Sequence, residues 1–417
     1  MRVTSLTLAI VMVGSMTHAA DYDSYGGWKG LRFEARDRFY LAERKGTWWF
    51  VTPDGFAFFS KGVNTVRYTG DNAPTLGHAP YGKATVAKYG SAEKWAAATA
   101  ERLRRWGFNT IGSWGDRIMW EQKVPYTVNL NLAARAGANW EKGTMPDFFS
   151  QSFRETVRTT CREQCQPRRN DRYLLGYFTD NELAWHADWR GKKSFLEVCL
   201  EMPERSAGRR AALGLLAERG HKPNDATTAD EEAFLALAAD QYFRTCHDAI
   251  RAADPNHLIL GCRFAGYAPE PVVRAMKGRA DVLSNNNYST TPPVAALAAL
   301  YKQAGAPILI TEFSFKAMDS GLPNTKGAGK PLATQKDRAD GYERYVTALA
   351  ALPHCVGFHW FEYCDEPKEG RFDGENSNYG LVRINDEAWE ILTERMEAIN
   401  PQLEAIHHSG KSKKKKS

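Results

Sequence analysis

Two glutamates stand at the ends of apolar runs that have the character of buried β-strands. Glu182 follows the run 174–179, with Asn181 directly before it, and Glu312 follows the run 307–311. If these runs are the fourth and seventh strands of one barrel, their ends lie on roughly opposite sides of its mouth. Two carboxyl groups facing each other across a cleft can cleave a glycosidic bond, because one protonates the leaving oxygen while the other attacks or activates water. A lone glutamate would favour an ordinary loop residue, but the pair favours this chemistry.

Three other acids lie close to these strand ends and compete with the pair. Strand alternation turns Asp180 away from the direction that Glu182 and its neighbours take. Glu362 and Glu375 fall near the last predicted strand, and Glu375 lies in a glycine-flanked loop. Glu375 is therefore the best third acid, either as a substrate contact or as a brace for its loop.

Aromatic residues are unusually abundant, with 12 Trp and 17 Tyr in 417 residues. Such rings suit flat ligands with polar edges. Trp114, Trp185 and Trp189 are candidates for stacking on sugars, with packing inside loops as the alternative. Four further residues can donate to or accept from sugar hydroxyls, or serve in the core instead: Asn64, His186, Arg263 and His359.

Short strand-like runs alternate with longer helical patterns over most of the chain. Residues 92–106 and 232–253 have the apolar period of 3.6 that is typical of helices. Eight strand–helix units predict an α/β fold, a (β/α)₈ TIM barrel. A doubly wound open sheet is the alternative, but no glycine-rich phosphate fingerprint follows an early strand. The predicted strands are 56–63, 107–112, 124–130, 174–179, 257–262, 281–286, 307–311 and 356–361.

Two further features shape the expected architecture. Residues 48–59 read as a short N-terminal β-hairpin around the Pro53-Asp54-Gly55 turn. The segment 189–230 is long for a connection between a strand and a helix, so we expect it to overhang the mouth of the barrel.

Several motifs resemble those of a known enzyme family. They are the segment 48–64, GYFTDNEL at 176–183, GFHWFEY at 357–363 and GRFDGENSNYG at 370–380. Together with Glu312 they resemble the clan A retaining glycoside hydrolases and are most similar to glycoside hydrolase family 50, the β-agarases. The resemblance extends over roughly residues 33–400.

The resemblance implies a role for each matching residue. Glu182 would be the acid/base, Asn181 would bind the sugar 2-hydroxyl, and Glu312 would be the nucleophile. Tyr288 would donate a hydrogen bond to the nucleophile, and Trp360 would form the floor of the subsite beside the scissile bond. An acid/base requires a raised pKa at Glu182, whereas a nucleophile requires Glu312 to stay ionised.

The activity that follows is hydrolysis of β-galactosidic bonds in agarose-type galactans or their oligosaccharides, by a double displacement on two glutamates. Another clan A activity, such as a β-galactosidase or a mannanase-like enzyme, is the first alternative. A catalytically silent carbohydrate-binding protein is the second, although such a protein has no need of both acids and the adjacent asparagine.

The two ends of the sequence have a different character from the middle. Arg2, the apolar stretch 6–13 and the small residues Ala19 and Ala20 predict a signal peptide over 1–19, and hence a secreted or periplasmic protein. The hydrolase domain would then span 20–408, followed by a disordered lysine-rich tail over 409–417.

Charge and hydropathy exclude two classes of partner. The net charge of +6 comes from Arg2 and five tail lysines, and without them 49 basic residues face 49 acidic ones. A nucleic-acid-binding domain would carry its own basic excess, so no nucleic-acid partner is expected. No run of about 20 apolar residues occurs, so an integral membrane span is not expected either.

Seven cysteines, an odd number, leave at least one thiol unpaired. Cys161 and Cys165 are four residues apart, but no histidine stands near them at the spacing of a metal ligand. A structural role, including one disulfide that involves Cys199, is favoured over a metal site. Neither a metal nor another cofactor is expected.

Overall fold

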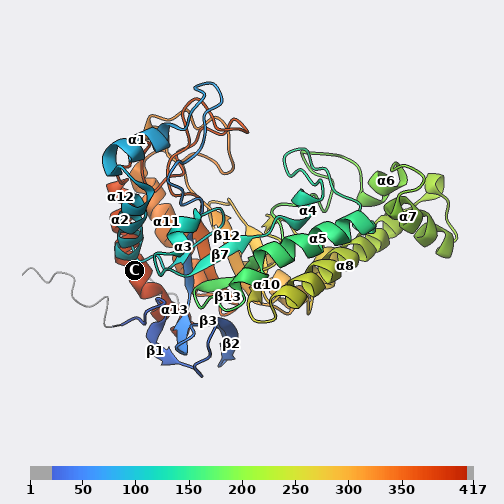
Figure 1. Ribbon diagram of the computed structural model, residues 1–417, viewed down its shortest axis with the longest axis horizontal. Helices are drawn as coiled ribbons and strands as arrows, with labels where there is room; N and C mark the ends of the chain where they lie inside the picture. The colour runs from blue at the N-terminus through green and yellow to red at the C-terminus, as the bar shows by residue number, and fades with distance from the viewer. Residues whose placement is uncertain (1–20, 411–417) are drawn as a thin grey trace, which may run out of the picture.

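The computed structural model describes residues 21–410. The predicted signal peptide over 1–19 and residues 411–417 of the predicted tail 409–417 lie outside the described residues, whereas Ser409 belongs to the last helix. Within the described residues, helices surround a cylinder of parallel strands (Figure 1), and the predicted (β/α)₈ barrel is confirmed.

The parallel sheet runs in the order β10-β11-β12-β13-β5-β6-β7-β8-β9. All eight predicted runs supply strands to it. The strands are β5 (Ser60–Val63), β6 (Thr110–Ile111), β7 (Tyr126–Asn129), β8 (Leu174–Phe178), β9 (Leu258–Ile259), β10 (Phe264–Ala265), β11 (Leu283–Asn286), β12 (Ile308–Phe313) and β13 (Cys355–Trp360).

The segment 258–265, which carries β9 and β10, closes this sheet into a barrel. On one side, the Leu260 amide donates to the carbonyl of Tyr177 in β8 at 2.7 Å. On the other side, the Arg263 amide donates to Ser284 Oγ in β11 at 2.8 Å. The strand is split because Gly261 and Arg263 have positive φ angles of 88° and 50°. It is therefore a single interrupted fifth strand, which ends three residues beyond the predicted run 257–262.

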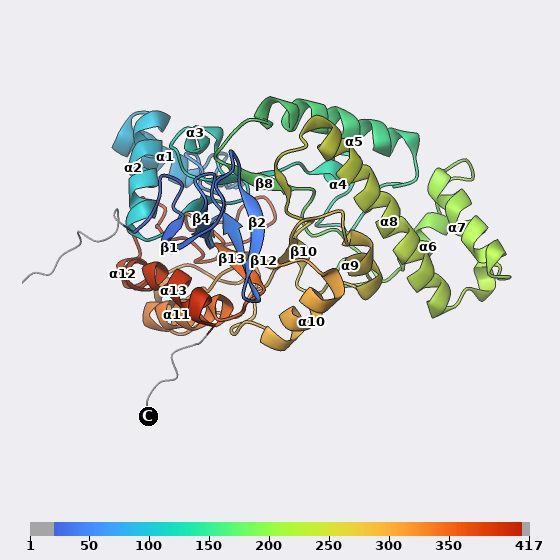
Figure 2. The same cartoon turned by 90° about the horizontal axis from the view of Figure 1, so that it is seen from below.

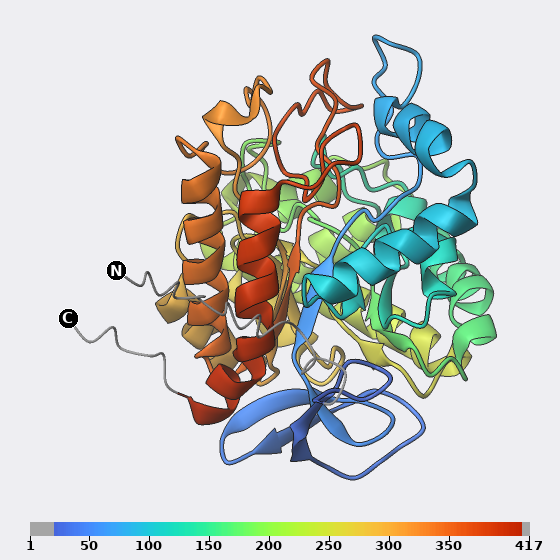
Figure 3. The same cartoon turned by 90° about the vertical axis from the view of Figure 1, so that its left-hand side faces the viewer.

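Side chains on the barrel strands alternate between two cores. Ile308 and Ile310 belong to the large cluster between the strands and the helices, whereas Leu309 belongs to a smaller cluster inside the barrel. Phe50 and Phe58 of the N-terminal sheet are part of that inner cluster. The small sheet thus packs against the amino-terminal end of the barrel, as Figure 3 shows below the barrel strands.

The predicted hairpin is present, and it belongs to a four-stranded antiparallel sheet. Strands β3 (Thr47–Val51) and β4 (Phe56–Phe58) pair around a turn in which Gly55 has a φ of 86°. Strands β1 (Trp28–Arg32) and β2 (Tyr40–Arg44) extend the sheet to the order β1-β4-β3-β2. The predicted run 56–63 is therefore divided between two sheets, with β4 in this one and β5 in the barrel.

The predicted helices 92–106 and 232–253 correspond to α2 and α8. Helix α8 begins four residues early because Thr227 and Asp230 form a capping box at its start. The helices are α1 (Pro80–Tyr89), α2 (Ala92–Arg105), α3 (Arg117–Trp120), α4 (Leu132–Arg135), α5 (Gln151–Gln164), α6 (Phe195–Leu200), α7 (Ala207–Glu218), α8 (Thr228–Ala253), α9 (Glu270–Met276), α10 (Val294–Ala304), α11 (Gln335–Ala350), α12 (Glu390–Ile399) and α13 (Leu403–Ser409).

The long connection after β8 forms a lobe beside the barrel. It contains α6 and α7, which extend away from the barrel strands together with the first part of α8 (Figure 2). None of the helices in the described residues is long and apolar enough to span a bilayer.

All seven cysteines are buried free thiols, so the predicted disulfide that involves Cys199 is wrong. Cys199 lies in α6 and packs in the apolar core with Phe195 and Leu196. Unpaired cysteines commonly behave as small apolar side chains, which accounts for their burial here. In residues 21–410, no group of histidine, cysteine or acidic side chains could hold a metal ion.

Candidate active site

A cavity of about 1030 Å³ lies at the carboxyl ends of the barrel strands, opposite the small sheet. Its wall contains both glutamates of the predicted pair, Glu182 and Glu312. Five other sequence candidates line the same cavity: Trp114, Asn181, Trp189, Tyr288 and Glu375. The barrel therefore brings together residues that are up to 261 positions apart in the sequence.

Glu312 lies within β12 and is held by two donors. Arg263 Nη2 donates to its Oε1 at 2.6 Å, and the Tyr288 hydroxyl donates to its Oε2 at 2.7 Å. The contact expected for Tyr288 is thus present. Both donors favour the ionised form of the carboxyl group, since a carboxylate accepts hydrogen bonds at each oxygen.

Glu182 lies just beyond β8, in a backbone conformation that is unusual for a residue with a side chain. Its φ is 51°, in the left-handed region, and its amide donates to the carbonyl of Arg263 at 3.1 Å. Its Oε1 accepts a hydrogen bond from Asn286 Nδ2 at 2.9 Å. Asn286 also donates to Asn181 Oδ1 at 3.1 Å, so one amide orients both members of the Asn-Glu motif.

Arg263 is the buried cation of the site. Its side chain is fully buried, and its guanidinium lies 4.3 Å from the ring centroid of Trp114. In addition to Glu312, Nη2 donates to the carbonyl of Thr311 at 3.0 Å. A charge removed from water requires a partner of opposite sign, and Glu312 provides it.

Burial raises the pKa of both catalytic candidates. It raises the pKa of Glu312 to about 7, although Arg263 and Tyr288 lower it, and the nearby Glu182 raises it further. Burial likewise raises the pKa of Glu182, against the hydrogen bond from Asn286. Loss of hydration therefore outweighs the two donors to Glu312 and the single donor to Glu182, so both carboxyl groups titrate above the usual range of a glutamate.

Asp180 points away from the cavity, as strand alternation predicts. Its carboxylate accepts hydrogen bonds from the Ala133 amide at 2.9 Å and from the Tyr242 hydroxyl at 2.8 Å. It therefore caps the start of α4, and burial raises its pKa to about 7. Its role is to hold the end of β8 in place.

A loop on the far side of the cavity joins Glu375 to an arginine that sequence reasoning missed. Arg371 Nη2 lies 2.7 Å from the Glu375 carboxylate and 2.8 Å from that of Asp373. The same guanidinium lies over Phe361, 5.4 Å from its centroid. Glu375 thus braces its loop and lines the cavity. The spacing of Arg371, Asp373 and Glu375 was the sequence signal for this cluster.

Trp360 does not reach the cavity, and the prediction that it forms a subsite floor is wrong. It is fully buried, donates from Nε1 to the carbonyl of Tyr379 at 2.9 Å and packs on Phe313. Successive side chains of a strand point to opposite faces. Phe361, the next residue, lines the cavity instead.

Asn64 and His359 are core residues that do not line the cavity. Asn64 donates to the carbonyl of Thr311 at 2.8 Å and accepts from the Ser113 amide at 2.8 Å. His359 is fully buried, with Nε2 3.0 Å from Ser60 Oγ, and burial lowers its pKa to about 3. The amide of Asn64 and the imidazole of His359 therefore connect neighbouring segments of the barrel.

Trp185 and His186 also lie away from the cavity wall. Trp185 is buried against Phe148 and Tyr242, with centroid distances of 5.7 and 5.3 Å. His186 contacts the carbonyl of Ala187 through Nδ1 at 2.9 Å. Neither residue is placed to bind a ligand in the cavity.

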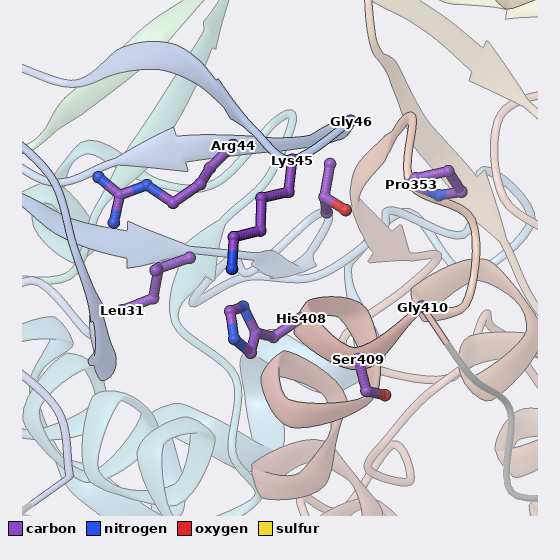
Figure 4. Close-up of a pocket in the computed structure, with 9 residues that line it drawn as sticks. Leu31, Arg44, Lys45, Gly46, Pro353, His408, Ser409 and Gly410 are labelled. Carbon is purple, nitrogen blue, oxygen red and sulfur yellow. The ribbon is translucent and has the colours of Figure 1, made fainter.

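A second hollow lies at the opposite end of the barrel, between the small sheet and α13 (Figure 4). Its walls include Arg44, Lys45 and His408, and no residue that lines it has a carboxyl side chain. This hollow therefore offers no pair of carboxyl groups for cleavage of a glycosidic bond.

Known proteins resemble this chain in sequence and in fold. No family model matches the chain. It is 30% identical to β-agarase A of Vibrio sp. (strain JT0107) in an alignment of 450 positions, which covers 85% of this chain and 44% of that protein. It is 26% identical to β-agarase B of the same strain in an alignment of 500 positions, which covers 96% of this chain and 52% of that protein. The chain thus spans about half the length of the curated relatives it matches.

The solved structures give the same result for the fold. An agarase, AgWH50C, superposes with a TM-score of 0.81 at 25% identity, over 93% of this chain and 66% of that one. An exo-β-agarase superposes with a TM-score of 0.82 at 24% identity, over 93% and 68%. The chain is therefore similar to β-agarases in sequence and has the fold of agarases.

Proposed function

We propose that this protein is a β-agarase-type glycoside hydrolase that cleaves β-galactosidic bonds in agarose-type galactans or their oligosaccharides. The observation that carries the proposal is that Glu182 and Glu312 line the same cavity and have unlike hydrogen-bond partners. Similarity to β-agarases supports the galactan as substrate. The predicted signal peptide supports export, which would place the enzyme where polymeric substrates occur.

The unlike partners support a different role for each glutamate. Glu312 accepts hydrogen bonds from a guanidinium and a phenol, whereas Glu182 accepts one from a neutral amide. When the two carboxyl groups share one proton, the donors retain the negative charge on Glu312 and leave the proton on Glu182. Glu312 is then the nucleophile, and Glu182 is the acid.

The reaction follows as a double displacement. Glu312 attacks the anomeric carbon while Glu182 protonates the leaving oxygen, which gives a covalent glycosyl-enzyme. Glu182, now ionised, removes a proton from water, and that water cleaves the ester bond to Glu312. Each step inverts the anomeric carbon, so the product retains the β configuration.

Two neighbours complete the proposed substrate site. Asn181 lines the cavity beside Glu182, and because its Oδ1 accepts from Asn286, its amide nitrogen is left for a sugar 2-hydroxyl. Trp114 presents one face to Arg263 and lines the cavity. Its other face is proposed to stack on a sugar ring.

Product analysis tests this function. The purified protein is incubated with agarose, a chromogenic β-galactoside and a mannan, and the first products are followed by NMR. We expect cleavage of agarose or its oligosaccharides, with the β-anomer released first. Cleavage of only the simple galactoside or the mannan would support the alternative clan A activities. Binding without cleavage would support a silent carbohydrate-binding protein.

The pH profile of kcat/KM should be bell-shaped, with an acidic limb well above the ordinary pKa of a glutamate. Activity requires Glu312 ionised and Glu182 protonated, so it falls as pH drops below the Glu312 pKa of about 7. Tyr288→Phe removes a donor that lowers this pKa. The acidic limb should therefore move to higher pH, with a loss of about 10- to 100-fold in kcat/KM.

The control for this prediction is Tyr301→Phe, in a tyrosine that contacts Trp48 and His354 away from the cavity. Its profile should match that of the unaltered enzyme. An unchanged acidic limb in Tyr288→Phe would contradict the assignment of Glu312 as the group that titrates there.

A further inference from the structure

The left-handed backbone of Glu182 is held by a hydrogen bond at each side of the residue. The amide is fixed by Arg263, as described above, and the carbonyl accepts a hydrogen bond from Arg190 Nη1 at 2.6 Å. A residue with a Cβ atom adopts a φ of 51° only when its surroundings impose it. The contact with Arg190 is part of what fixes the direction of the Glu182 side chain.

Arg190 makes this contact with a guanidinium whose other edges are also used. Nε and Nη2 contact the Asp188 carboxylate at 2.9 and 2.6 Å, and Nη1 also donates to the carbonyl of Trp140 at 3.0 Å. The side chain is 2% exposed. A planar fork can hold a carboxylate and two carbonyls at once, which the single ammonium of a lysine cannot do in the same geometry.

The same arginine connects Glu182 to two aromatic residues of the cavity wall. Trp189 precedes Arg190 in the chain, is 74% exposed and lines the cavity. Trp140, whose carbonyl Arg190 holds, lines it too. An exposed indole at the rim of a sugar-sized cavity is a surface on which a sugar ring can stack.

We infer that Arg190 is a positioning residue for Glu182, and that it couples the acid to a leaving-group sugar site formed by Trp140 and Trp189. This inference rests on the proposed function, in which Glu182 protonates the leaving oxygen. Residues beside the proton donor then face the sugar that departs. Binding of that sugar and orientation of the acid would depend on the same guanidinium.

Leaving-group dependence tests the positioning role. The dinitrophenolate of a dinitrophenyl β-galactoside departs without protonation, whereas the leaving sugar of a galactan oligosaccharide requires the acid. In both cases kcat/KM reports the glycosylation step alone. Arg190→Met should lower kcat/KM about 100-fold for the oligosaccharide and less than about threefold for the dinitrophenyl substrate. Because Arg190 is one of the cations that lower the pKa of Glu182, the basic limb should move to higher pH.

Two variants control for folding and for charge. Arg190→Lys retains the charge without the fork, so its oligosaccharide defect should be smaller and its basic limb unchanged. Arg279→Met removes an arginine that also contacts a carboxylate and a carbonyl, those of Asp240 at 2.6 Å and Ala275 at 3.0 Å, and that does not line the cavity. It should leave both substrates unaffected. Equal losses on both substrates in Arg190→Met and Arg190→Lys would show a merely structural residue and overturn the inference.

The sugar site has its own measurement. Trp189→Ala should raise KM for the oligosaccharide about 10-fold and leave the dinitrophenyl substrate unchanged. An unchanged oligosaccharide KM would overturn the sugar site.

Glu182→Ala in the same assay distinguishes a failure of the proposed function from a failure of the inference about Arg190. If it lacks leaving-group dependence, the proposed function fails. If it shows that dependence and Arg190→Met does not, only the inference fails.

Discussion

Replacing Glu312 by glycine is expected to lower hydrolysis of galactan oligosaccharides by about 10⁴-fold or more, and to make azide a substitute nucleophile. The variant loses the carboxylate that attacks the anomeric carbon but retains Arg263 and Tyr288, the two donors that held it. A small anion can occupy the vacated space between these donors. With an activated β-galactoside, azide should attack directly and give the α-galactosyl azide.

Glu182→Ala is the matched variant at the other carboxyl group. Its nucleophile is intact, so a glycosyl-enzyme still forms from a substrate with a good leaving group. Azide then attacks that intermediate and, after two inversions, gives the β-galactosyl azide. The anomeric coupling in the NMR spectrum distinguishes the two products. Azides of the same configuration from both variants, or a Glu312→Gln enzyme with near-normal activity, would contradict the assigned roles.

The positions of the two glutamates could be predicted because strand ends are visible in the sequence. Runs such as 174–179 and 307–311 are apolar up to a final threonine, as expected of strands buried on both faces. In a parallel barrel, the residue that ends such a run lies at the functional end. The eight runs therefore locate the cavity before any contact is known.

Other features depend on information that no local pattern contains. Trp360 and Phe361 are adjacent aromatics, and a one-residue difference in register decides which of them faces the cavity. Arg190 and Arg263 lie on segments between regular elements, and their partners are set by loop geometry. The raised pKa of Glu312 likewise follows from burial, which depends on the whole barrel.

Arg263→Met should reduce both activity and stability, and the loss of stability should depend on pH. The variant leaves Glu312 buried without its cation, which costs about 3–5 kcal/mol when the carboxyl group is ionised. Arg263 lowers the pKa of Glu312, so its removal raises that pKa further above the unfolded value. A carboxyl group with a raised folded pKa destabilises the fold as pH rises through that pKa and does so least when protonated. Urea unfolding should therefore show a larger loss of unfolding free energy at pH 8 than at pH 5, together with a loss of about 100-fold or more in kcat/KM at pH 7.

Adding Glu312→Gln to Arg263→Met removes the unpaired charge, so the double variant should recover stability at pH 8 while remaining inactive. A deficit of equal size at both pH values would mean that Arg263 stabilises the barrel by packing on Trp114 and Phe178 rather than by neutralising Glu312.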